Sequence, residues 1–118
     1  MKPQNKFKRE EKRGSKRTFN SIEAKLNCGR KNYTCAIENI ARNGLLVIVA
    51  SKKNVTTFIP EAIVRLKFQS SNGKTINLRC EMRWVHINKI PIYGFRYRLG
   101  VETINPPIEY KKFLKTLK

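Results

Sequence analysis

Apolar and polar residues alternate along most of the chain beyond residue 20, which is the period-two pattern of strands that bury one face. In 93–103, for example, Phe95, Tyr97 and Leu99 fall on one face while Arg96 and Arg98 fall on the other. A continuous apolar run rich in β-branched residues also fits a strand when it is as short as six residues. The predicted strands lie at 22–26, 33–37, 45–50, 63–69, 76–87 and 93–103.

The period changes to that of a helix at the C-terminal end. Tyr110, Phe113, Leu114 and Leu117 recur at helical spacing. Asn105 is a candidate cap and proline suits a first helical position, so we expect a helix over about 106–117. Six short strands that are mostly antiparallel fit a small closed barrel, because closure removes exposed edges. The expected fold is all-β, a six-stranded antiparallel barrel with the helix over one open end.

Charge changes the picture of the first residues. The chain has 118 residues, with 26 Lys and Arg against eight acids, all of them Glu, giving a net charge of +18. Eight of the basic residues lie within 1–17, where Phe7 is the only large apolar side chain. We therefore expect a flexible basic N-terminal arm over 1–17 and one barrel domain over 18–118. A surface potential of this sign attracts anionic partners without choosing among them.

Candidate chemistry is sparse. His86 is the only histidine, there is no aspartate, and no motif marks a nucleophile, so we expect a structural role for His86 and a protein that is not an enzyme. Cys28, Cys35 and Cys80 form no Cys-x-x-Cys pair, and we expect no metal site or cofactor and a buried apolar role for Cys35 and Cys80. We found no signal peptide and no apolar run of about 20 residues, which predicts a cytoplasmic protein without membrane insertion.

Two spaced motifs lie where a barrel could bring them together. Arg13 and Arg17 form an Arg-x-x-x-Arg just before the first strand, and 39–44, Asn-Ile-Ala-Arg-Asn-Gly, has the spacing of Asp/Asn-x-Ser-x-x-Gly. With "CEMRWV" at 80–85 and "YRLGVETI" at 97–104, this order resembles the PilZ domain family along nearly the whole chain. The family's six-stranded barrel with a C-terminal helix agrees with the period analysis.

The resemblance implies a receptor for the bacterial second messenger cyclic di-GMP, with no chemistry performed on it and a downstream protein partner. A guanidinium offers a planar fork that can bond guanine O6 and N7 or a phosphate, which suits Arg13 and Arg17. In the 39–44 turn, Asn39 can bond a guanine edge, and Gly44 permits a close approach or a positive φ. Asn39 is equally compatible with a turn role in which its side chain bonds its own backbone.

Two positions complicate the implied site. Ala41 replaces the family's serine, and a lost neutral hydrogen bond of ~0.5–1.5 kcal/mol predicts roughly two- to tenfold weaker binding. Trp84 belongs to the family's late-strand motif, where its ring can contact ligand, yet the alternation places it with Met82 on the core face and favours packing.

Two other functions remain compatible with the sequence. A basic barrel can bind RNA or single-stranded DNA, as OB-fold proteins do, although no row of aromatic residues falls on the predicted polar faces. The second alternative is a degenerate PilZ domain that binds no ligand and acts as a protein adaptor.

Overall fold

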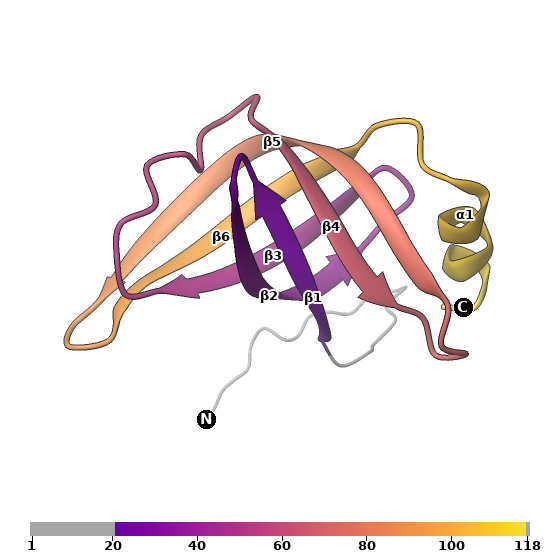
Figure 1. The fold of residues 1–118 in the computed structure, drawn as a ribbon, viewed down its shortest axis with the longest axis horizontal. Helices are drawn as coiled ribbons and strands as arrows, with labels where there is room; N and C mark the ends of the chain where they lie inside the picture. Colours follow the sequence, from indigo (N-terminus) through magenta and orange to yellow (C-terminus); the bar gives the residue numbers. More distant parts are fainter. Residues whose placement is uncertain (1–20, 118) are drawn as a thin grey trace, which may run out of the picture.

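The computed structural model describes residues 21–117, which form one closed barrel and one helix (Figure 1). All neighbouring strands are antiparallel, and the order around the barrel is β1-β2-β3-β6-β5-β4. The expected fold is therefore confirmed. The elements are β1 (Ile22–Cys28), β2 (Lys31–Ile40), β3 (Gly44–Ser51), β4 (Ile63–Gln69), β5 (Thr75–Ile90), β6 (Gly94–Thr103) and α1 (Ile108–Lys115). The expected arm, with Arg13 and Arg17, lies outside the described residues.

The barrel interior is filled by the apolar side chains that alternate along each strand. In β4 every second residue is buried, namely Val64, Leu66 and Phe68. Cys35 and Cys80 are buried among them as free thiols, as expected, and burial raises the pKa of each to about 12. Among residues 21–117 no charged or amide side chain is buried, and the buried hydroxyls of Tyr97 and Tyr110 are hydrogen-bonded, so the interior is a packed apolar core.

The two ends of the barrel are covered by different segments. At one end α1 buries Tyr110 and Phe113, and the Phe113 ring lies 5.4 Å from that of Phe68. At the other end the connection after β3 buries Val55 and Phe58, and the backbone N–H of Val55 donates to the Tyr97 hydroxyl. Figure 1 shows α1 and this connection at opposite ends of the molecule.

The helix begins two residues later than predicted. Asn105 does not cap it, because Asn105 has a positive φ of 45° and the N-cap is Pro107 in an extended conformation. The physical reason is the Pro106-Pro107 pair: a residue that precedes proline is disfavoured in the α region, so Pro106 cannot open the helix. None of the helices described in residues 21–117 is long and apolar enough to cross a membrane.

Candidate functional site

Two β-bulges interrupt the alternation on the outer face of the barrel. Pairing of β2 with β3 skips Glu38, and pairing of β5 with β6 skips Arg83. A bulge adds one residue to one strand and so reverses which face the following side chains occupy. Both bulges therefore change the residues that reach the surface.

The bulge at Arg83 overturns the core prediction for Trp84. Val85 takes the inward phase opposite Leu99, while Trp84 turns outward and is 41% exposed. Its indole lies on Gly100, where a Cβ atom would come within 2.1 Å of the indole nitrogen. Trp84 is thus a surface side chain seated on a glycine, and its ring can meet a ligand.

The bulge at Glu38 corrects the position of Asn39. Pairing resumes at Asn39, which lies opposite Leu46 as an exposed residue of β2, so the turn proper comprises only 41–43. Leu46 also pairs with Gly100, and Gly100 pairs with Trp84. Asn39, Leu46, Gly100 and Trp84 therefore form a row across four strands, which we call the bulge row. It spans three strand spacings, roughly 14 Å.

The turn after β2 is held by backbone hydrogen bonds. The Ala41 N–H donates to the Gly44 carbonyl at 2.8 Å, and the Thr103 N–H donates to the Asn43 carbonyl at 2.9 Å. The Tyr110 hydroxyl of α1 donates to the Ala41 carbonyl at 3.2 Å. Gly44 has no positive φ, but a Cβ there would lie 3.0 Å from the Val101 carbonyl, so close approach explains the glycine.

Four of the six predicted site residues line one open hollow of about 400 Å³ beside this turn. They are Asn39, Ala41, Gly44 and Trp84, and other lining residues are Asn43, Leu46, Arg83, Gly100 and Glu102. Residues 41 and 84 are more than 40 positions apart in the chain, and the β2-β3-β6-β5 order brings them together. The remaining predicted residues, Arg13 and Arg17, lie outside the described part of the chain.

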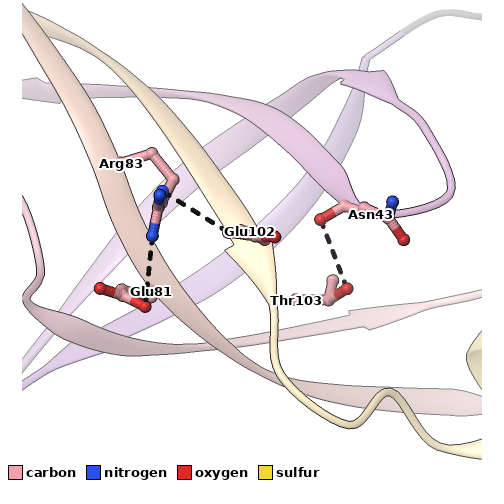
Figure 2. Close-up of polar contacts among 5 residues, drawn as sticks. All are labelled: Asn43, Glu81, Arg83, Glu102 and Thr103. Carbon is pink, nitrogen blue, oxygen red and sulfur yellow. Dashed lines mark hydrogen bonds and ion pairs between the residues drawn. The ribbon is translucent and has the colours of Figure 1, made fainter.

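A charged cluster at the edge of the hollow was not predicted from the sequence. Glu81 and Glu102 are cross-strand partners, and Arg83 bridges them with nitrogen–oxygen distances of 3.6 and 3.5 Å (Figure 2). Two facing carboxylates would repel an anion, and the guanidinium between them offsets that repulsion. Alternation along β5 puts Glu81 and Arg83 on one face, but only the register of β5 against β6 shows that Glu102 joins them, and neither strand alone determines that register.

His86 is also a surface residue. Its ring lies 5.2 Å from that of Trp84, and its cross-strand partner is Arg98. It therefore extends the aromatic surface of Trp84 along β5 and is not part of the barrel core.

The chemistry of the hollow favours binding over catalysis. An amide, an indole and a guanidinium can bond, stack on and neutralise a ligand. The thiols of Cys35 and Cys80 are buried in the core, and their raised pKa keeps them protonated at neutral pH, so neither can act as a nucleophile there.

Comparison with known proteins agrees with this arrangement. The curated proteins and the solved structures gave no match. The PilZ domain family matches residues 8–117, nearly the whole chain. PilZ domains are generally non-catalytic binding domains and typically receptors for cyclic di-GMP. The barrel, its C-terminal helix and the match over residues 8–117 lead to one conclusion: the chain belongs to the PilZ domain family.

Proposed function

We propose that the protein is a cytoplasmic receptor that binds cyclic di-GMP without chemical change and passes the signal to a protein partner. The observation that carries the proposal is the bulge row, which puts the Asn39 amide and the Trp84 indole at opposite ends of one open hollow. A ligand with two purines needs such separated contacts, one for a base edge and one for a base face.

Each part of the hollow has a distinct role in this proposal. The Asn39 amide bonds a guanine edge, and the exposed face of the Trp84 indole stacks on a base. Gly100 carries no side chain and so provides the seat for the indole, and Gly44 leaves the hollow open beside the turn. Arg13 and Arg17 supply the guanidinium forks that the family resemblance assigns to guanine and phosphate.

Electrostatics support an anionic ligand at this place. The net charge of +18 raises the local concentration of anions over the whole surface. Arg83 offsets Glu102 at the rim, so the carboxylate nearest the hollow is paired. This ion pair is exposed and weak, and it acts by limiting repulsion more than by adding affinity.

Ala41 sets the expected strength of binding. It is exposed and lines the hollow, and its backbone N–H and carbonyl are already bonded to Gly44 and Tyr110. A methyl group here cannot replace the serine hydroxyl, so affinity is lowered by roughly two- to tenfold while the turn stays in place.

Calorimetric titration of the full chain tests the proposal. Cyclic di-GMP should bind in preference to GMP, GTP and a short oligonucleotide of matched charge, at two ionic strengths. Phosphate contacts weaken steeply with salt, whereas guanine recognition should persist. Equal competition by the oligonucleotide would favour the nucleic-acid alternative, and no binding of any nucleotide would favour the ligand-free adaptor.

A further inference from the structure

The hairpin between β5 and β6 ends in an exposed apolar tip. β5 runs to Ile90 and β6 starts at Gly94, and between them Ile92 is 99% exposed and Tyr93 is 75% exposed. Ile87, near the end of β5, is 51% exposed. In Figure 1 this tip projects from the end of the molecule opposite α1. The protein thus presents its most exposed large apolar side chains, among residues 21–117, on a protrusion.

The backbone at the tip is unfavourable for the residue it carries. Ile92 has a φ of 77°, a left-handed conformation that a β-branched side chain rarely adopts. Glycine or asparagine would suit the position better, and either would also avoid an exposed aliphatic group. The conformation is held by a turn bond from the Tyr93 N–H to the Ile90 carbonyl. Folding therefore gives no reason for isoleucine here, which points to a role at the surface.

The tip is also fixed to the barrel. A Cβ at Gly94 would lie 2.4 Å from the Ser51 carbonyl oxygen and 2.7 Å from the Lys52 Cα. Gly94 thus lets the base of the hairpin pack directly on the end of β3. This contact brings Lys52 to the base of the tip, and Lys53 follows it in the chain.

The hairpin around the tip and the end of β3 that it contacts carry positive charge and no acidic side chain. Lys89 and Arg96 lie at the end of the β5–β6 ladder, opposite Phe95 and Asn88. The chain has no Asp or Glu over 39–60 or over 82–101, the stretches that contain the end of β3 and the β5–β6 hairpin. The hairpin thus has an apolar tip with basic side chains behind it. This arrangement complements a surface with an apolar interior and an anionic outer layer.

We propose that this tip docks the protein on an anionic lipid membrane surface, with Ile92 and Tyr93 at the level of the headgroups and Lys52, Lys53, Lys89 and Arg96 against the lipid phosphates. Three residues beyond the strands reach less than about 10 Å, which is the depth of an interfacial contact and not of a span. Tyrosine is common at this depth because its ring is apolar and its hydroxyl stays hydrated. A projecting tip can insert between lipid headgroups, which rearrange around it. The inference does not rest on cyclic di-GMP binding.

Vesicle co-sedimentation of the full chain tests the docking. Vesicles of phosphatidylcholine alone are compared with vesicles containing about a third phosphatidylglycerol, at physiological ionic strength. The wild type should bind the anionic vesicles. The double variant Ile92→Asn, Tyr93→Ser should bind at least about tenfold more weakly, because binding scales with buried apolar area. Asparagine accepts the positive φ, so the variant should keep its thermal midpoint.

Ile108→Ser is the matched control, since Ile108 is an exposed isoleucine (57%) on α1, away from the tip. It should bind like the wild type. Equal binding by the wild type and the double variant would show general electrostatic adsorption and overturn the proposal, as would no binding to either vesicle.

Fluorescence locates the contact. In a Trp84→Phe background, Tyr93→Trp places the sole tryptophan at the tip, and its emission should shift to the blue and be quenched by brominated lipids. An unshifted, unquenched emission on bound protein would mean that another surface holds the membrane. A protein partner for the tip would then be the better explanation.

Discussion

The seat of the Trp84 indole on Gly100 gives a sharp test of the site. In Gly100→Ala the new Cβ would lie 2.1 Å from the indole nitrogen, whereas ordinary contact needs at least 3.4 Å. The ring must therefore move by at least 3.4 − 2.1 = 1.3 Å. Gly100 has no positive φ and lies in β6, so alanine itself is acceptable to the backbone. The substitution should therefore displace the indole without disturbing the backbone of β6.

The expected effect on affinity is large and the effect on stability small. Stacking of a base on an aromatic side chain contributes ~1–3 kcal/mol, so its loss should weaken cyclic di-GMP binding by roughly five- to 150-fold. Alanine in a strand is favoured over glycine by roughly 0.5–1 kcal/mol, which offsets part of the packing lost by the indole. The thermal midpoint should therefore move by less than about 8 °C.

A double-mutant cycle measures this directly. Calorimetry on Gly100→Ala, on Trp84→Ala and on the double variant should show that Gly100→Ala has no further effect once the indole is gone. Trp84 is the only tryptophan, so its emission reports the displacement independently. Wild-type affinity in Gly100→Ala together with a shifted emission would refute a stacking role for Trp84.

Three further predictions concern the same proposed ligand. Ala41→Ser should tighten cyclic di-GMP binding by ~1 kcal/mol in calorimetry, because it supplies the hydroxyl that the family has at this position. In the same assay Arg13→Ala and Arg17→Ala should each lose more than that, because charge-assisted contacts are stronger, while Lys2→Ala should change little; equal losses would indicate diffuse electrostatics. Amide exchange across residues 14–19 should slow at saturating cyclic di-GMP if the Arg-x-x-x-Arg segment closes on the ligand, and unchanged exchange would exclude this switch.

The elements that could be predicted from the sequence are those whose pattern is unbroken. The predicted strand over 63–69 has the observed bounds of β4, because from Val64 to Gln69 its apolar residues alternate regularly with polar ones. Trp84 was assigned to the wrong face because one extra residue, Arg83, reverses the alternation, and a bulge in an otherwise regular strand has no composition of its own. The predicted helix start was wrong because a proline suits the first helical turn only when another proline does not follow it. Pro107 disfavours the helical conformation at Pro106, so Pro106 lies outside the helix.

The candidate site divides in the same way. The 39–44 motif and Trp84 could be identified from local sequence motifs. Both line the same hollow because the strand order brings β2 and β5 to the two sides of β3 and β6. The contributions of Leu46, Gly100 and Glu102 could not be recognised, because each depends on which residues face one another across two strands. The roles of Arg13 and Arg17 stay predictions.

In the proposed ligand site, the hydrogen bond from Tyr110 to Ala41 makes the C-terminal helix a support for the binding turn. Tyr110 is fully buried, and its hydroxyl fixes the Ala41 carbonyl from beneath the turn, while the Ala41 N–H is fixed by Gly44. Both polar backbone groups of the residue are thus immobilised before any ligand arrives. Ordering a loop on binding costs conformational entropy, and a turn that is already ordered avoids that cost. The helix therefore preorganises a surface that it does not itself present.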